Sequence, residues 1–330
     1  MEQAIKVSVC CVVYNHVEFL KTTLESFVNQ KTDFQFEVLV HDDASTDGSQ
    51  EIIRAFADAY PSIIKPIYQD ENQWKLNNRN PLIHELFPKA KGKYIALCEG
   101  DDFWTSTDKL QSQVDFLDHN PEFSAICANS EVWEKDRVTY DYKNIKWNWL
   151  GRSFSDELTV YDLSTHLFPH TSSWLFVNDF ELSEDHETFV VGDVPLFLLM
   201  ADKGRIKYVD RVLSVYRQHG GGVTNELRKR HALEHVNSLS EMLLSLDAFM
   251  GHRHSLSLKK ATIELHAIAL RDHASIGNLS RALKQLNDWG LLGTQSLYRL
   301  TLAFCQGLAQ RIKRQFSKRF KSITPSAKSE

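Results

Sequence analysis

Short apolar runs alternate with amphipathic segments over residues 1–130. Val7–Val13 is a continuous apolar run of strand length, and Val17–Asn29 repeats apolar residues such as Leu20 and Leu24 at helical spacing. The same patterns predict further strands at 36–40, 63–68, 94–98 and 123–132, and helices at 49–60, 81–90 and 109–120. Because strands and helices alternate, the sequence predicts an α/β fold with parallel strands and helices on both faces.

The pattern changes twice further along the chain. Residues 133–224 are irregular and rich in aromatic residues, with strands predicted at Ser173–Val177 and Ile206–Tyr216 and a helix at Val194–Asp202. From residue 225 onward the periodicity is helical throughout, at about 225–250, 256–276, 278–289 and 294–320. We therefore predict a domain at 1–224 and a C-terminal helical region at 225–330.

Composition places the chain among globular proteins. Its 330 residues are 42% hydrophobic and 25% charged, and no apolar run approaches the ~18–20 residues that span a bilayer. The N-terminal residues lack the features of a signal peptide. Of the five cysteines, none in a CxxC motif, four lie in apolar strand-like runs. We expect buried free thiols and a cytoplasmic location.

The charge is unevenly distributed. From Trp289 to the end there are eight Lys or Arg against one acid, so the body is acidic although the net charge is only −5. This distribution argues against a nucleic-acid partner. In the basic tail, Ile312, Phe316 and Phe320 recur every four residues. The tail is expected either to touch an anionic membrane surface peripherally or to pack on the acidic domain.

Polar residues follow three predicted strands, at Tyr14-Asn15, Asp42-Asp43 and 99–102. Ligands of such sheets bind beyond the carboxyl ends of the strands. The segment HDDASTDGS resembles a calcium loop, but Arg54 stands where that loop needs Glu. Two interpretations stay open here: a turn that caps the next helix, and a carboxylate that accepts a hydrogen bond from a pyrimidine base.

Three carboxylates crowd the third strand end, in Glu99-Gly100-Asp101-Asp102. Neighbouring carboxylates repel unless a positive group lies among them. The chain lacks the GxGxxG and GxxxxGK[ST] motifs, so a bound nucleotide would need another group to neutralise its phosphates. Mg²⁺ and Mn²⁺ prefer oxygen ligands and often share them with substrate phosphates. This stretch therefore predicts a divalent metal site (Mn²⁺ or Mg²⁺), with Gly100 allowing close backbone approach.

Four ordered segments, VSVCCVVYN, VLVHDDASTDGS, AKGKYIALCEGDDFW and YRQHGGGVT, resemble family 2 glycosyltransferases over about residues 5–224. The resemblance implies a GT-A-type, Rossmann-like, mixed and mostly parallel sheet. It also implies metal-dependent, inverting transfer of a hexosyl or hexosaminyl group from a nucleotide-sugar donor, a UDP-sugar in our expectation. The acceptor would be a hydroxyl of a glycan or lipid-linked glycan, in cell-surface polysaccharide or lipopolysaccharide biosynthesis.

The resemblance also implies roles for individual residues. Asp101 and His219 would bind the metal, and Asp193 would be the catalytic base, although Gly192 replaces the Glu that often precedes it. Residues 170–174 are expected on the acceptor side. The nucleotide would contact Val13, Tyr14, Asn15, Asp42 or Asp43, Arg79, Glu99 and Gly100, with Asp102 and Trp104 as supporting neighbours.

Two rival functions stay open. A sugar-nucleotide pyrophosphorylase would need a Gly- and Arg-rich phosphate loop containing Lys after the first strand, where this chain has YNHVEF. A non-catalytic nucleotide-sugar binding protein would keep the paired carboxylates but would need no base.

Overall fold

The structure is a computed structural model that divides into two compact units, 1–220 and 221–330. It describes residues 4–77, 80–135, 137–141, 155–165, 169–179, 193–219, 232–272 and 274–323.

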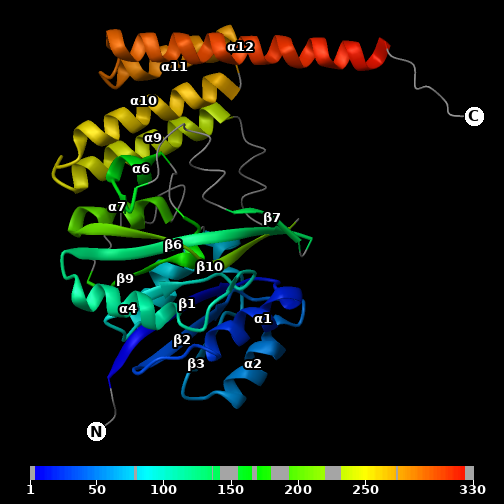
Figure 1. Cartoon of the computed structure of the whole chain (residues 1–330), viewed down its shortest axis with the longest axis vertical. Helices are drawn as coiled ribbons and strands as arrows, with labels where there is room; N and C mark the ends of the chain where they lie inside the picture. The colour runs from blue at the N-terminus through cyan, green and yellow to red at the C-terminus, as the bar shows by residue number, and fades with distance from the viewer. Residues whose placement is uncertain are drawn as a thin grey trace, which may run out of the picture. The chain divides into compact units, whose positions relative to one another are not determined.

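The first unit begins with a parallel half-sheet in the order β3-β2-β1-β4. These strands span Ile5–Val13 (β1), Gln35–Asp42 (β2), Ile64–Tyr68 (β3) and Tyr94–Leu97 (β4). Helices α1 (Val17–Val28), α2 (Ser49–Ala59) and α4 (Lys109–His119) lie on one side of it (Figure 1). All four strands run in the same direction, so their carboxyl ends share one edge.

The sheet continues through β9 (Leu175–Val177), which pairs antiparallel with both β4 and β6 (Phe123–Glu134). Strand β10 (Arg205–Gln218) then pairs parallel with β6. Short strands pair antiparallel with these: β5 (Phe103–Trp104), β7 (Arg137–Asp141) and β8 (Glu157–Leu158). The predicted class, an α/β fold with a mixed sheet flanked by helices, is confirmed.

Packing of the first unit follows the period of two along β1. Val7, Val9, Cys11 and Val13 face the core that α1, α2 and α4 cover, and all four are buried. The cysteines of the sheet, Cys10, Cys11, Cys98 and Cys127, are buried free thiols as predicted, whereas Cys305 is exposed.

One predicted helix differs from the structure. The segment expected as a helix over 81–90 forms a π-helical turn, η1 (Leu82–Leu86), and a 3₁₀ turn, η2 (Phe87–Lys89). Pro88 lies in the second turn and has no backbone N–H to donate, so an α-helix cannot continue regularly through it.

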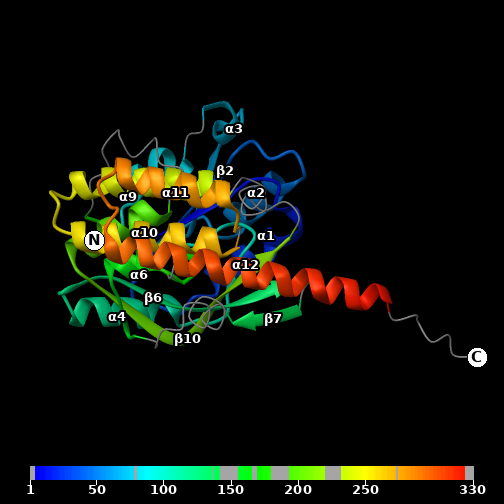
Figure 2. The same ribbon diagram turned by 90° about the horizontal axis from the view of Figure 1, so that it is seen from above.

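The second unit is helical in its described residues: α9 (Ala232–Phe249), α10 (Ser255–Asp272), α11 (Ile276–Asp288) and α12 (Thr294–Ile323). Helix α10 packs on both α9 and α12, and Figure 2 shows α10 and α12 side by side. Leu270, Leu286 and Leu300 form part of its apolar core. Among the described residues, no helix combines the length and apolar content needed to cross a bilayer.

Candidate functional site

The loops after β1 and β2 are fastened to each other by hydrogen bonds. Asn15 N–H donates to Ser45 Oγ (2.9 Å), and Asn15 Oδ1 accepts from Thr46 N–H (2.8 Å). Asn15 has φ +56°, a left-handed conformation that Asn tolerates better than most residues. His16 N–H donates to Ser49 Oγ (3.0 Å). These contacts hold the His16 side chain at the shared strand edge.

Asp47 caps two helices from within the second loop. Its Oδ2 accepts from Val17 N–H at the start of α1 (2.9 Å), and its Oδ1 accepts from Ser49 N–H at the start of α2 (3.0 Å). Carboxylates at these positions satisfy backbone donors that a helix leaves unpaired. The interpretation of this segment as a capping turn therefore holds for Asp47.

Asp42 and Asp43 have different partners. Both oxygens of Asp43 accept from backbone N–H groups, of Gln73 (2.8 Å) and Trp74 (3.2 Å), at the start of α3 (Gln73–Asn77). Asp42 Oδ1 accepts from Ser45 N–H (2.9 Å) and Gln50 Nε2 (2.8 Å), while its Oδ2 is buried without a hydrogen-bond partner among the described residues. Of these two carboxylates, Asp42 is therefore the one with an oxygen that has no hydrogen-bond partner among the described residues.

Asp101 lies between two imidazoles. Its Oδ2 is 2.9 Å from His219 Nε2 and 3.7 Å from His16 Nε2. Burial opposes ionisation of Asp101, but the hydrogen bond to His219 and the neighbouring His16 outweigh it, so the pKa of Asp101 is lowered. Burial lowers the pKa of His16 and so favours its neutral form.

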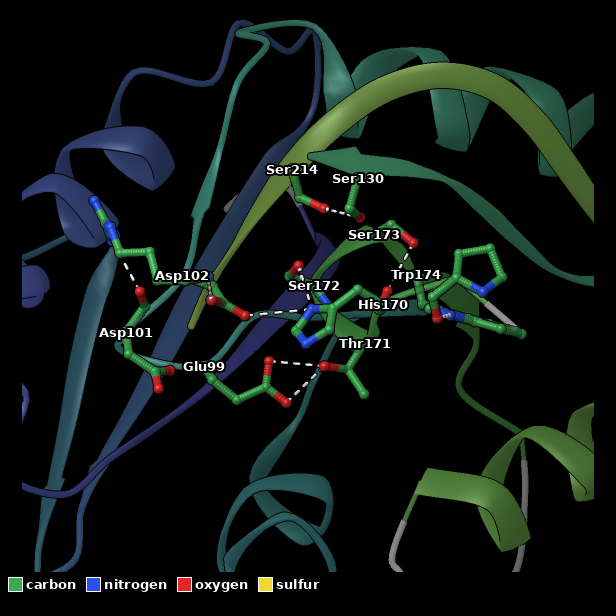
Figure 3. A network of polar contacts seen from close by, with 12 residues as sticks. Glu99, Asp101, Asp102, Ser130, His170, Thr171, Ser172, Ser173, Trp174 and Ser214 are labelled. Atoms are coloured by element: carbon green, nitrogen blue, oxygen red, sulfur yellow. Dashed lines mark hydrogen bonds and ion pairs between the residues drawn. The ribbon is translucent and has the colours of Figure 1, made fainter. Parts of the chain in front are cut away.

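Glu99 faces the segment before β9. The Thr171 hydroxyl reaches both of its carboxylate oxygens, at 2.8 and 2.9 Å (Figure 3). Burial, then the negative charge of Asp101 and less strongly that of Asp193, raise the pKa of Glu99 to about 7, against the hydrogen bond from Thr171. The charge of Asp193, the predicted base, is thus one of the influences that act on Glu99.

Asp102 is buried and turned toward His170. Its Oδ2 lies 3.3 Å from His170 Nδ1 and its Oδ1 accepts from Arg217 N–H (2.9 Å), as Figure 3 shows in part. Burial and the charges of Asp101 and Glu99 raise its pKa. Ligand-type atoms of Glu99, Asp102 and His170 lie within 4.8 Å of one another.

The donor set fits a divalent cation. Neighbouring ligands of an octahedral ion with bonds near 2.1 Å lie about 3 Å apart. Asp101 Oδ2 and His219 Nε2, which are hydrogen-bonded at 2.9 Å, are one pair of donor atoms that could share such an ion. Glu99, Asp102 and His170 offer a second set of oxygen and nitrogen atoms beside it. Two groupings are therefore compatible with a metal, where the sequence predicted one.

Buried side chains contact three consecutive backbone carbonyl oxygens, those of Ser172 and Ser173 in η3 (Thr171–Ser173) and of Trp174 after it. Trp104 Nε1 donates to Ser172 O (2.8 Å) and Gln113 Nε2 donates to Ser173 O (2.9 Å). The third carbonyl, of Trp174, lies 3.5 Å from Lys109 Nζ. These buried donors fix the segment that carries Thr171 and His170 to the carboxylates. The supporting role expected of Trp104 thus acts through this segment.

Lys109 is fully buried. Its Nζ donates to Gln113 Oε1 (2.8 Å) and lies 4.4 Å from the centre of the Trp104 ring. Burial lowers the pKa of Lys109 to about 7, because a charged ammonium loses its hydration here.

Trp174 connects the same segment to α7 (Asp193–Lys203). Its ring stacks on Phe197 of that helix, with centroids 3.7 Å apart and planes at 12°. Asp193 is the first residue of α7, and its Oδ1 accepts from Val194 N–H (2.9 Å). The stack therefore couples the position of the predicted base to the fixed segment.

The remaining predicted residues lie at the same strand edge, apart from Arg79, which lies outside the described residues. The Tyr14 hydroxyl accepts from Lys75 Nζ (2.7 Å). A Cβ at Gly100 would lie 2.8 Å from Val13 Cγ2 and 2.9 Å from His16 Nδ1, so glycine is required there.

His16 was not among the predicted site residues, and His170 was expected only on the acceptor side. His16 contacts Asp101 and His170 contacts Asp102 only in the folded sheet. A single histidine in the sequence does not predict such a contact. The one local sign is that both lie near a strand end or a strand start.

The sequence model of the family described as Glycosyl transferase family 2 matches residues 8–181, which contain all three strand-end loops. The chain belongs to this family. It is a glycosyltransferase, and its relatives include enzymes of polysaccharide biosynthesis.

Among curated proteins, an uncharacterised protein of Mycobacterium tuberculosis is 29% identical over 252 residues, 74% of this chain and 69% of the relative. The Escherichia coli enzyme WfaP is 32% identical over 132 residues, 40% of this chain and 48% of the relative. Its name describes a glucosyltransferase that uses UDP-Glc and α-D-GlcNAc-diphosphoundecaprenol.

Among solved structures, S. aureus TarS 1–349 in complex with UDP-GlcNAc aligns with a TM-score of 0.61 at 16% identity, over 94% of this chain and 92% of that chain. The chain spans 54% of the longer TarS structure. This likeness confirms the predicted GT-A fold.

Proposed function

We propose that this glycosyltransferase moves a hexosyl or hexosaminyl group from a UDP-sugar to an acceptor hydroxyl, with inversion and with the help of a divalent metal. The observation that carries the proposal is the shared strand edge. There lie the oxygen of Asp42 that has no hydrogen-bond partner among the described residues and the Asp101–His219 pair, and the charge of Asp193 acts on the nearby Glu99. A nucleotide base, a diphosphate and an acceptor hydroxyl need these three kinds of group in turn.

The nucleotide is assigned to the loops after β1 and β2. Because both oxygens of Asp43 are engaged with α3, Asp42 is the carboxylate that accepts from the N3–H of a uracil. Val13, which pairs with Asp42 between β1 and β2, is assigned to the nucleotide as well, together with Tyr14, Asn15 and Gly100 of the strand-end loops. Arg79 is kept as a diphosphate contact on the resemblance alone.

Asp101 and His219 would hold Mn²⁺ or Mg²⁺ together with diphosphate oxygens, and the imidazole favours Mn²⁺. When bound, the ion supplies charge stabilisation to the departing nucleoside diphosphate. Glu99, held by Thr171, is assigned to a ribose or sugar hydroxyl, and Asp102 with Trp104 supports the cluster.

Asp193 is proposed as the general base that removes the proton of the acceptor hydroxyl as its oxygen attacks the anomeric carbon. Such a role contributes about 10²–10⁴ in rate. Its place at the start of α7 and the effect of its charge on Glu99 support this assignment. A non-catalytic nucleotide-sugar binding protein would not need a carboxylate there.

The acceptor is proposed to be a glycan or a lipid-linked glycan of cell-surface polysaccharide or lipopolysaccharide biosynthesis. The diphosphoundecaprenol acceptor in the name of WfaP supports a lipid-linked one. The protein would then act in the cytoplasm at the inner face of the membrane, in peripheral contact with it.

The test is isothermal titration calorimetry with UDP, GDP and dTDP and their sugars, with and without Mn²⁺. We expect tightest binding of a UDP-sugar, strengthened by Mn²⁺ and weakened in the Asp42→Asn variant. A preference for GDP would overturn the uracil assignment. Formation of a nucleotide sugar from a sugar phosphate and UTP would favour the pyrophosphorylase.

A further inference from the structure

Helix α12 (Thr294–Ile323) packs one of its faces against the other helices of its own unit. Leu300 is fully buried and Ala303 nearly so. A Cβ at Gly307 would lie 2.4 Å from the Arg271 carbonyl oxygen, so the helix backbones approach closely there. Leu300, Ala303 and Gly307 recur at spacings of three and four and define the inward face.

The opposite face of α12 is apolar and exposed. Tyr298 is 70% exposed and Leu302 41%, and Cys305 is exposed as well. These residues also recur at spacings of four and three, and at 3.6 residues per turn they lie about half a turn from the inward face. We call Tyr298, Leu302 and Cys305 the outer stripe. A contiguous exposed apolar patch marks an interaction surface, whereas single exposed apolar side chains do not.

The sequence continues this spacing along the rest of the helix. Counting onward from Cys305 by threes and fours reaches Ala309, Ile312, Phe316, Phe320 and Ile323. The stripe in sequence therefore extends over most of the 30 residues of α12. A long apolar stripe along one side of a helix is typical of a helix that packs that side against another apolar surface.

Charge decides which partner fits. Between Thr294 and Ile323 there are seven Lys or Arg and no Asp or Glu. Arg299, the one of these basic residues whose side chain the structure describes, pairs with Glu264. A second copy packed along this stripe would bring two sets of basic residues together without acids to pair them. An anionic bilayer matches both the apolar stripe and the positive charge.

We infer that α12 lies in the surface of an anionic membrane, with the outer stripe toward the acyl chains and its Lys and Arg at the head groups. The membrane contact itself does not depend on the proposed function. Only its role, to bring the enzyme to a lipid-linked acceptor, rests on that proposal. It assigns the contact to one face of one helix, where the sequence left membrane contact and packing on the acidic domain as alternatives.

The test is co-sedimentation of the full chain with vesicles of phosphatidylcholine alone or mixed with phosphatidylglycerol. We expect binding to the anionic vesicles only, weakened about tenfold in the Tyr298→Ser/Leu302→Ser double variant, because two apolar side chains no longer enter the bilayer. The matched control is Leu256→Ser on α10, whose side chain is 69% exposed. This control should bind like the wild type.

Three outcomes would overturn the inference: no binding to anionic vesicles, equal binding by the double variant, or a dimer in light scattering that the double variant abolishes. UDP binding measured on the same samples separates this from the proposed function. Wild-type protein that binds vesicles but no UDP would refute only the nucleotide-sugar proposal, and the reverse result only the membrane inference.

Discussion

His219 Nε2 lies 2.9 Å from Asp101 Oδ2, although 118 positions separate the two residues in the chain. The strand that ends at Leu97 and the strand that ends at Gln218 bring them together. We predict that His219→Ala weakens Mn²⁺-dependent UDP binding about tenfold or more, because one of two ligands is lost. Titration calorimetry at fixed UDP would measure it, with His119→Ala, an exposed histidine of α4, as the control. If the Mn²⁺ dependence is unchanged, the metal assignment to Asp101 and His219 is wrong, and Glu99, Asp102 and His170 are the alternative ligands.

The two neighbouring acids after β2 should separate binding from stability. Asp42→Asn replaces an acceptor by a donor group and should weaken UDP binding by about tenfold with little change in melting temperature. Asp43→Asn should instead lower the melting temperature, because it weakens the cap of α3. Thermal melts and UDP titrations of both variants distinguish the two. The same effect on UDP binding from both substitutions would contradict the assignment.

The Asp193→Asn variant should bind UDP-sugar like the wild type and lose about 10²–10⁴ of its turnover. Nucleotide release in the presence of acceptor would measure turnover, and calorimetry would measure binding. If turnover is retained, another group removes the acceptor proton.

The stack of Trp174 on Phe197 should position α7 for catalysis. Phe197→Leu keeps an apolar side chain but loses the stacked ring, and we expect a lower kcat with an unchanged donor KM. Leu198→Val, on the same helix and equally buried, is the control for lost packing. Both variants should lose some stability, so equal kcat values at equal folded fraction would show that the stack has no positioning role.

Lys109 should make stability depend on pH. Its pKa is lowered by burial to about 7, below the ordinary value of 10.5, so above pH 7 the unfolded chain binds a proton that the folded chain does not. The free energy of unfolding should therefore rise between pH 7 and about 10.5, by at most about 1.4 kcal/mol per pH unit. Below pH 7 this contribution is lost.

Denaturant unfolding of the wild type and of Lys109→Met measures that dependence. The Met variant lacks the titrating group, so its advantage over the wild type should be largest at pH 6 and should shrink as the pH rises. Parallel pH profiles of the two proteins would mean that Lys109 stays charged when folded.

Local periodicity was enough to predict the elements that carry the site. The strand predicted at Val7–Val13 is observed at Ile5–Val13, and the helix predicted at Val17–Asn29 at Val17–Val28. Each has a long, regular apolar pattern that its own residues determine. Helix α3, five residues long, has no such pattern and depends on the cap that Asp43 supplies from another segment.

The sequence also predicted some of the residues of the site, because these residues follow regular strands. Asp42, Glu99 and Asp101 follow predicted strands, and the carboxyl ends of parallel strands meet at the edge where ligands bind. The sequence therefore predicted these three residues in the site. The sequence did not decide between Asp42 and Asp43, since that choice depends on which oxygens other segments occupy. The sequence also did not predict that His16 lies beside Asp101, because only the tertiary structure brings the two residues together.

The most direct measurement is transfer of radiolabelled sugar from a UDP-sugar to a lipid extract that contains diphosphate-linked glycans, in the presence of Mn²⁺. The wild type should label the lipid fraction, and Asp193→Asn should not, although it binds the donor equally well. Labelling by Asp193→Asn at the wild-type rate, or donor binding by the wild type without any transfer to lipid-linked or free glycans, would contradict the account.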